Sequence, residues 1–180
     1  VFDLNAEAAS EAAKAVGGVA VAGDVANEED ADRAVDAAVE SFGDLRILVN
    51  CAGIGTAGRI VGREGPLPLA DFEKVIRVNL IGSFNMLRVA AARMTAQDPL
   101  EDNERGVIVN TASVQGLQSM KGVPAYAASK GGILNLTRQM ALEYAQDNIR
   151  VLAVNPGTID TPLVAEAAAG IGGDYEELKK

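Results

Sequence analysis

The chain has 180 residues, 48% of them hydrophobic, and this length is enough for one domain with a sizeable core. Its net charge of −9, without a run of basic residues, argues against nucleic acid and anionic membranes as partners. The single cysteine, Cys51, excludes an internal disulfide. Because no apolar run approaches the roughly 18 residues of a membrane span and no signal peptide opens the chain, we expect a cytoplasmic protein.

In chain order, apolar runs with strand character alternate with segments of helical spacing. The first half predicts a strand over 1–4, a helix over 5–16, a strand over 19–22, a helix over 27–43 and a strand over 46–50. Asn5 has the side chain of a helix N-cap, and Gly17 and Gly43 follow the last helical residues.

A loop rich in glycine and proline covers 51–68. The second half then predicts a helix over 71–94, a polar loop over 96–106, a strand over 107–113, a helix over 125–145 and a strand over 149–157. Such alternation, with strands that are nearly continuous apolar runs, predicts parallel strands buried on both faces. The predicted fold class is therefore α/β, a doubly wound parallel sheet of the Rossmann type in three αβα layers, formed by one domain over 1–180.

Ligands bind such sheets beyond the carboxyl ends of the strands, so the residues that follow the strands are the candidates. They are Asp3, Asp24, Asn50 to Gly53, Ser113 and Asn155 to Gly157. The segment "GIGTAG" at 53–58 matches a dinucleotide-binding fingerprint, but that motif opens directly into a helix. Here Pro66 and Pro68 follow the glycines, so we interpret the segment as a glycine-rich strand end beside a cofactor.

Tyr126 and Lys130 are four residues apart in a helical segment, so both side chains leave the same face. An ammonium beside a phenol favours the phenolate form, and this is one way to build an acid/base in a chain without histidine. Taken alone, the pair fits an ordinary exposed helix at least as well.

Six short motifs decide between these readings: "DV", "NCAG", "VNL", "NTAS", "YAASK" and "NPG", in this order and each in the expected kind of element. Together they resemble the short-chain dehydrogenase/reductase family over most of the chain. The resemblance implies a catalytic set of Asn79, Ser113, Tyr126 and Lys130. Tyr126 would be the general acid/base and Lys130 would favour its ionised form and bind the nicotinamide ribose. Ser113 would polarise the substrate oxygen, and Asn79 would hold a water that relays protons to Lys130.

The resemblance also implies a nicotinamide cofactor. Asp3, with Leu4 beside it, would accept hydrogen bonds from the adenosine ribose and repel a 2′-phosphate, which favours NAD over NADP. The other implied cofactor contacts are Asp24 and Val25 at the adenine, Asn50, Ala52 and Gly53 beside the cofactor, and Pro156, Gly157, Ile159 and Thr161 at the nicotinamide amide. No metal ligands are predicted.

The family's first strand and glycine-rich phosphate turn are expected before Val1, and its last strand is expected beyond Thr161. We therefore expect the 180 residues to be a fragment of a longer chain. In the strand order 3-2-1-4-5-6 the first strand lies centrally. We therefore expect the strands at 1–4 and 19–22 to lack a partner that joins them to 46–50, and this chain alone to bind dinucleotide poorly.

The predicted reaction is the NAD-dependent interconversion of a secondary alcohol and a ketone, with 3-hydroxyacyl-CoA as the favoured substrate. "NCAGI" and the 71–94 helix look like the type II 3-hydroxyacyl-CoA dehydrogenase branch, whereas "GLQSMKGVPAYAASKGG" looks like alcohol and sugar dehydrogenases. A 3-oxoacyl-carrier-protein reductase is a further alternative, against which Asp3 argues. A non-catalytic, cofactor-sensing relative is an alternative of another class. The resemblance also implies a homodimer or homotetramer that pairs through helices 71–94 and 125–145.

Overall fold

The computed structural model describes residues 1–63, 65–161 and 164–165. Its helices are α1 (Ala6–Val16), α2 (Glu28–Phe42), α3 (Leu69–Ile76), α4 (Gly82–Thr95) and α5 (Pro124–Glu143), with a π-helical turn at Arg77–Ile81 and 3₁₀ turns at Val114–Gly116 and Ala145–Asp147. Its strands are β1 (Phe2–Asp3), β2 (Val21–Ala22), β3 (Ile47–Asn50), β4 (Val61–Gly62), β5 (Gly65–Pro66), β6 (Gly106–Thr111) and β7 (Ile149–Val154).

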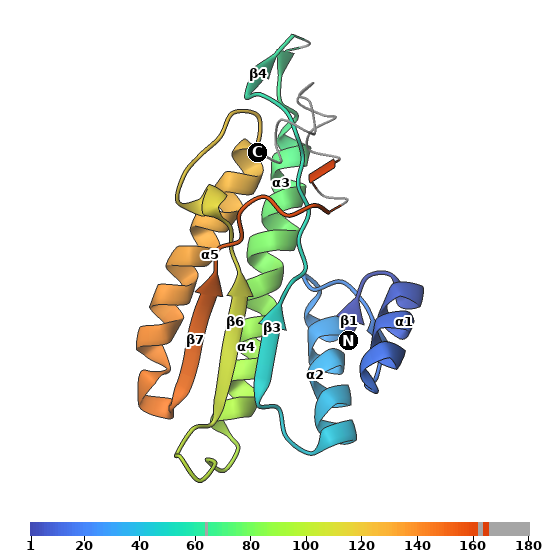
Figure 1. The fold of residues 1–180 in the computed structure, drawn as a ribbon, viewed down its shortest axis with the longest axis vertical. Helices are drawn as coiled ribbons and strands as arrows, with labels where there is room; N and C mark the ends of the chain where they lie inside the picture. Colours follow the sequence, from blue (N-terminus) through green and yellow to red (C-terminus); the bar gives the residue numbers. More distant parts are fainter. Residues whose placement is uncertain (64, 162–163, 166–180) are drawn as a thin grey trace.

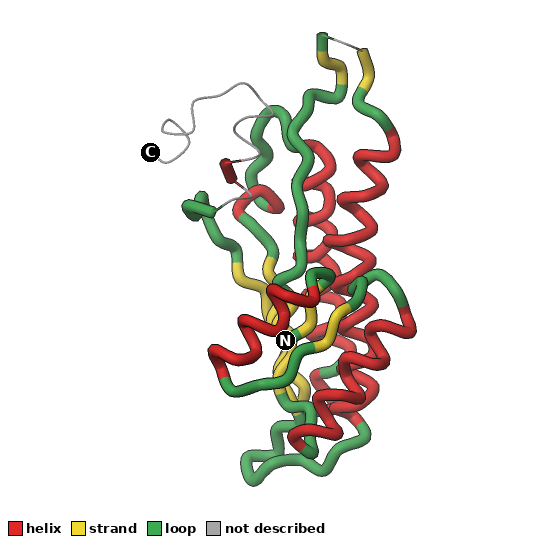
Figure 2. Tube along the Cα trace, turned by 90° about the vertical axis from the view of Figure 1, so that its right-hand side faces the viewer, coloured by secondary structure: helices red, strands yellow, loops and turns green. Residues whose placement is uncertain are grey.

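The predicted α/β architecture with parallel strands is confirmed. β3, β6 and β7 form a parallel sheet in that order, and β1 pairs in parallel with β2. The longer helices α2, α4 and α5 cover one face of the strands, and α1 lies on the other side (Figure 1, Figure 2). Within the described part of the chain, no strand pairing joins β1 and β2 to β3, as the sequence predicts.

An open groove of about 650 Å³ separates the β1–β2 pair from β3. Ile47 and Val49 of β3 line it and are 62% and 53% exposed. At the carboxyl ends of the strands the groove is lined by Asp3, Asn50, Cys51, Ala52 and Gly53. The groove therefore reaches the strand ends where the sequence places its candidate cofactor residues.

The main core packs α4 and α5 against β6 and β7. Leu87, Met94 and Ile108 are 0% exposed, and Ile149 of β7 is 2% exposed within the same cluster. Burying apolar side chains of this size contributes roughly 1.5–3 kcal/mol each relative to leaving them in water. This cluster fixes the helices that carry the candidate catalytic residues relative to the strand ends.

The helix predicted over 71–94 begins earlier, at Leu69, and contains one turn of π-helix. By length and composition alone, the continuous helix Leu69–Thr95 could cross a membrane, with a mean hydropathy of 1.2 in its most apolar window. The helix is not an uninterrupted apolar run, because Arg77, Arg88 and Arg93 lie within it. Half of the window is buried inside the fold, which is ordinary for a core helix that packs against a sheet and a second helix.

Several local predictions are confirmed by the backbone. The Asn5 side chain accepts hydrogen bonds from the backbone N–H groups of Glu7 and Ala8 and so caps α1. Gly17 ends α1 with a φ of 67°, a left-handed conformation that favours glycine. The loop predicted over 51–68 is not wholly irregular, because β4 and β5 form a short antiparallel hairpin inside it.

Candidate active site

The candidate catalytic residues come from three segments near the carboxyl ends of β3 and β6. Tyr126 and Lys130 lie on the first turns of α5, Asn79 lies in the π-helical turn, and Ser113 follows β6. Gly53 lies between them: a Cβ atom at Gly53 would be 3.6 Å from Asn79 Oδ1 and 3.8 Å from Lys130 Nζ. The structure thus places Asn79 and Lys130 against the loop that follows β3, and the 3₁₀ turn that begins after Ser113 packs against Lys130 at Gly116.

Lys130 is buried, with only 4% of its surface exposed. Its Nζ lies 5.5 Å from the centroid of the Tyr126 ring and donates a hydrogen bond of 2.6 Å to the carbonyl oxygen of Thr111. Within the described residues no carboxylate pairs with this ammonium. Burial therefore lowers the pKa of Lys130 from 10.5 to about 8, and the charge interaction with Cys51 partly opposes the shift. Lys130 is a cation held next to a phenol at neutral pH.

Asn79 is completely buried, and its amide is used inside the protein. Its Oδ1 accepts a hydrogen bond from Ile54 N at 2.8 Å, and its Nδ2 donates to Ile54 O at 2.9 Å and to Ser129 Oγ at 3.0 Å. Ser83 Oγ donates to the Asn79 carbonyl at 2.7 Å. Because both amide hydrogens are taken, a water held by Asn79, as predicted, would have to donate to one of its oxygens.

Ser113 is 6% exposed and stands at the start of the 3₁₀ turn that follows β6. Its Oγ accepts a hydrogen bond from Gln115 N at 3.1 Å, so its hydroxyl hydrogen is available to another acceptor. The neighbouring Val114 N donates to Pro156 O at 3.1 Å, which brings the Pro156 segment beside Ser113. Ile159 and Thr161 are exposed beyond it, and the Thr161 hydroxyl donates to Ile159 O within its own segment.

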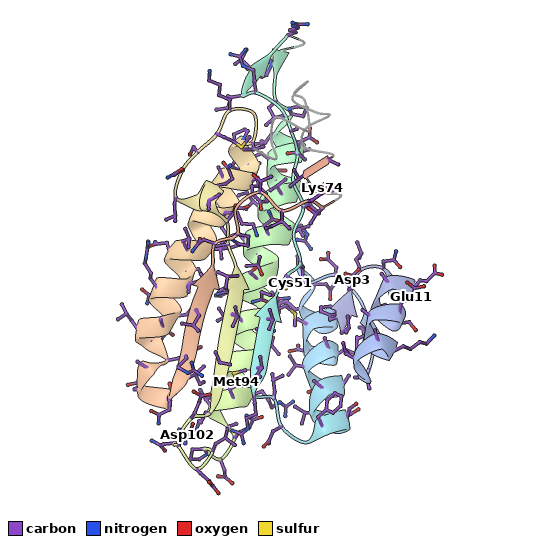
Figure 3. The ribbon with its side chains drawn as sticks, in the orientation of Figure 1. Asp3, Glu11, Cys51, Lys74, Met94 and Asp102 are labelled. Carbon is purple, nitrogen blue, oxygen red and sulfur yellow. The ribbon has the colours of Figure 1, made fainter. Side chains whose placement is uncertain are left out.

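Asp3 is exposed at the end of β1, where its Oδ1 accepts a hydrogen bond from Asn5 N at 2.8 Å. Its second oxygen has no partner among the described residues. Figure 3 shows Asp3 after β1 and Cys51 after β3, at the same end of the two sheets, whereas Glu11 lies on the outer side of α1. Leu4 beside Asp3 is 78% exposed.

The predicted adenine residues are held by the helices behind them. Asp24 N donates to Asp30 Oδ2 at 2.8 Å, and Asp24 Oδ1 accepts from Ala26 N at 2.8 Å. The carbonyl of Val25 accepts a hydrogen bond from Asn85 of α4 at 2.8 Å. The bond from Asp24 and the nearby Arg33 hold the pKa of Asp30 below its usual value. The loop that follows β2 is therefore fixed to α2 and α4.

The part of the groove at the strand ends offers residues that suit a dinucleotide cofactor, whereas most of the remaining lining is apolar. Asp3, Val25, Asn50, Ala52 and Gly53 all line one groove, which has a carboxylate at one wall and a glycine beside the buried Lys130 ammonium at the other. Asn50 lines the groove as well, and its amide Nδ2 donates to Asn110 Oδ1 at 2.9 Å, which links β3 to β6.

A model of the family described as "short chain dehydrogenase" matches residues 1–171 of the chain. The chain belongs to the short-chain dehydrogenase family. The family that the six motifs resemble is thus confirmed.

Relatives of this short-chain dehydrogenase carry several names. The chain is 43% identical over 143 residues to a 3-hydroxyacyl-CoA dehydrogenase type-2 from Bos taurus, covering 78% of this chain and 55% of that protein. The counterpart from Drosophila melanogaster is 38% identical over 167 residues, covering 91% and 66%. A 2-(R)-hydroxypropyl-CoM dehydrogenase from Xanthobacter autotrophicus is 40% identical over 168 residues, covering 90% and 64%.

A crystal structure of a 3-hydroxyacyl-CoA dehydrogenase type-2 from Mycobacterium avium superposes with a TM-score of 0.83 at 36% identity. The match covers 98% of this chain and 74% of that one. The chain therefore spans a little over half to about two thirds of the length of the curated relatives named above. These matches confirm the predicted resemblance to the type II 3-hydroxyacyl-CoA dehydrogenases.

The sequence analysis missed the polar residues that hold the site together. Ser83 and Ser129 bind Asn79, and Thr111 provides the carbonyl for Lys130. Asn110 binds Thr137, two turns along α5 from Ser129, and neither has a described bond to the candidate catalytic residues. Asn110, Thr111 and Ser129 stand inside the motifs "NTAS" and "YAASK", so a signal was present. Serine within a helix usually points to solvent or bonds a nearby carbonyl, so the sequence gives no sign that Ser129 binds a side chain of another segment.

Proposed function

We propose that the protein to which this chain belongs is an NAD-dependent oxidoreductase that interconverts a secondary alcohol and a ketone, with 3-hydroxyacyl-CoA as the favoured substrate. The observation that supports it most is the buried Lys130 ammonium beside the Tyr126 ring, with the loop after β3 packed against it at Gly53. Hydride chemistry needs a positioned cofactor and one tuned proton donor, and this arrangement supplies the donor.

When bound, the nicotinamide cofactor supplies or accepts the hydride. In the reduction direction, the Tyr126 hydroxyl donates its proton to the ketone oxygen, and the Lys130 ammonium stabilises the phenolate that is left. The Ser113 hydroxyl donates a hydrogen bond to the same substrate oxygen, so negative charge that develops there meets two donors. In the oxidation direction the Tyr126 phenolate takes the proton back.

The substrate assignment is tested by comparing rates of NADH oxidation by the full-length protein. Acetoacetyl-CoA, the acetoacetyl group on an acyl-carrier protein, and a simple ketone such as acetoin are the three substrates. We expect the highest kcat/KM with acetoacetyl-CoA. A higher value with the carrier protein, or with acetoin, would support the reductase or alcohol dehydrogenase alternative instead, and NADH binding without any turnover would support a sensing role.

Asp3 gives a prediction about cofactor choice. The free carboxylate oxygen of Asp3 would lie near the 2′-phosphate of NADPH and would repel it. The kcat/KM of wild-type protein should therefore be at least about tenfold higher with NADH than with NADPH. Asp3→Asn keeps an acceptor for Asn5 N–H but removes the charge, so the NADH-to-NADPH ratio of kcat/KM should fall severalfold. Glu11→Gln, an exposed acid on α1, is the matched control and should leave the ratio unchanged.

A second open pocket, of about 650 Å³, supports a substrate carried on an anionic group. Arg59 and Lys121 line it, with no acidic residue in the lining and no ion-pair or hydrogen-bond partner among the described residues. One wall is the segment that runs from Gln115 to Lys121, which leaves Ser113 and leads to Tyr126. Gly58 N donates to Gly122 O at 2.8 Å and closes the two loops on each other.

These two cations should bind a phosphate of coenzyme A. Arg59→Ala and Lys121→Ala should each raise the KM for acetoacetyl-CoA about three- to tenfold, with kcat little changed. The KM for acetoacetyl-N-acetylcysteamine, a thioester without phosphates, should not move. Lys74→Ala, an exposed lysine on α3 outside this pocket, serves as the control (Figure 3). An equal rise in KM for both thioesters would contradict the proposal that Arg59 and Lys121 bind a phosphate of coenzyme A.

A further inference from the structure

Ser129 lies on α5 between Tyr126 and Lys130 and is 0% exposed. Its Oγ accepts a hydrogen bond from Asn79 Nδ2 at 3.0 Å and donates one to the Tyr126 carbonyl oxygen at 2.7 Å. A single hydroxyl thus joins the π-helical turn of one helix to the first turn of the other.

The connection continues beyond Asn79. The remaining polar atoms of the Asn79 amide bind Ile54 N and Ile54 O at 2.8 and 2.9 Å. Ile54 follows Gly53 in the loop that lines the cofactor groove. The bonds therefore run from this loop through Asn79 and Ser129 to the backbone of Tyr126.

Serine is suited to this place because its hydroxyl accepts and donates at once. A serine inside a helix commonly donates to a carbonyl one turn back, and that bond alone would be local. Here the same oxygen also accepts from a side chain of another helix, so it sets the two helices relative to each other. Alanine at this position would leave one buried amide hydrogen of Asn79 without an acceptor among the contacts described.

We propose that Ser129 is a positioning residue, which holds Asn79 and the loop after β3 in register with Tyr126 and Lys130. The inference rests on the proposed function, because the register matters for turnover only where Tyr126 and Lys130 move the proton. Small displacements of reacting groups are costly in rate, so the effect should appear in kcat before it appears in binding.

The test compares two hydroxyls with matched bonds on the same helix. Thr137 Oγ1 accepts from Asn110 Nδ2 at 3.0 Å and donates to Ile133 O at 2.8 Å, two turns further along α5. Ser129→Ala in the full-length protein should lower kcat about tenfold, with the KM for acetoacetyl-CoA and the Kd for NADH within about twofold of wild type. Thr137→Val should lower stability to a similar degree but leave kcat within about twofold.

A double-mutant cycle shows whether Ser129 acts through Asn79. The kcat of the Ser129→Ala/Asn79→Ala protein should equal that of Asn79→Ala alone, and the two substitutions should also be non-additive in urea unfolding of the cofactor-free protein. Additive effects, an unchanged kcat in Ser129→Ala, or an equal loss in Thr137→Val would each overturn the proposal. Should Asn79→Ala not fold, the comparison with Thr137→Val decides alone.

The two proposals fail in different ways. Wild-type protein that folds and binds NADH but turns over no ketone contradicts the proposed function. In that case the unfolding cycle still measures the coupling between Ser129 and Asn79, and additive unfolding effects would overturn the positioning role independently of turnover.

Discussion

Tyr126→Phe in the full-length protein should lower kcat/KM for ketone reduction by about a thousandfold, because it removes the hydroxyl that gives its proton to the substrate oxygen. The phenylalanine ring keeps the packing of the tyrosine ring on α5. We therefore expect the free energy of unfolding and the Kd for NADH to stay close to the wild-type values. Stopped-flow measurement of NADH oxidation with acetoacetyl-CoA gives the rate, and NADH fluorescence gives the Kd.

Tyr144 offers a matched control for this experiment, since it caps the far end of the same helix and packs against the main core. Tyr144→Phe should leave kcat/KM within about twofold of wild type. Turnover by Tyr126→Phe at the wild-type rate would remove Tyr126 from the chemistry, and an equal loss in Tyr144→Phe would mean that the effect is not specific to the site.

Lys130→Met should abolish most of the activity and yet make the protein more stable at neutral pH. Burial lowers the pKa of Lys130 to about 8, from 10.5 in an ordinary environment, so the folded protein holds this proton less tightly than the unfolded chain does. Below pH 8 the buried ammonium therefore costs about 3 kcal/mol of folding free energy. Methionine removes that cost and loses one hydrogen bond, to Thr111 O, worth about 1 kcal/mol.

The sign of the pH dependence follows from the same pKa. Between pH 8 and 10.5 the unfolded wild-type chain binds the additional proton, so wild-type stability rises with pH in this window. The advantage of Lys130→Met in urea unfolding should thus be largest at pH 7 and should shrink by pH 10. A variant that is less stable than wild type at pH 7, or an advantage that does not change with pH, would contradict this account of Lys130.

The loss of activity in Lys130→Met has a separate cause. Without the ammonium nothing in the described site stabilises the Tyr126 phenolate, so kcat should fall by about a hundredfold or more. In wild-type protein the charge of Lys130 disappears as the pH rises through about 8. The wild-type rate of ketone reduction should accordingly decline on the alkaline side, and this decline should be absent from the residual activity of the variant.

Sequence analysis predicted the architecture because the signals for it are local. The alternation of apolar strands and amphipathic helices, the Asn5 cap and the Gly17 stop each depend on a few neighbouring residues, and the structure confirms them. Motif order, with the rule that the carboxyl ends of parallel strands meet at one edge, predicts that Tyr126, Lys130, Ser113 and Asn79 act together, and this stays a prediction.

The features that were not predicted depend on contacts between distant segments. One extra residue in the Arg77–Ile81 turn leaves the apolar spacing of the 71–94 helix almost unchanged, so the π-helical turn has no clear sequence signal. The orientation of Asn50 depends on Asn110, which lies 60 residues further along the chain. The role of Ser129 likewise depends on which side chain of another helix it meets.

In the proposed reaction, a hydride passes from the nicotinamide cofactor to the ketone carbon while Tyr126 protonates the ketone oxygen. The measurement that tests it most directly uses full-length protein, NADH carrying deuterium at the transferable position of the nicotinamide C4, and acetoacetyl-CoA, with the product analysed by mass spectrometry. We predict that wild-type protein forms 3-hydroxybutyryl-CoA with one deuterium on the carbinol carbon. The Tyr126→Phe protein should form almost none of this product. A folded protein that binds the labelled cofactor but yields no labelled alcohol would contradict the account.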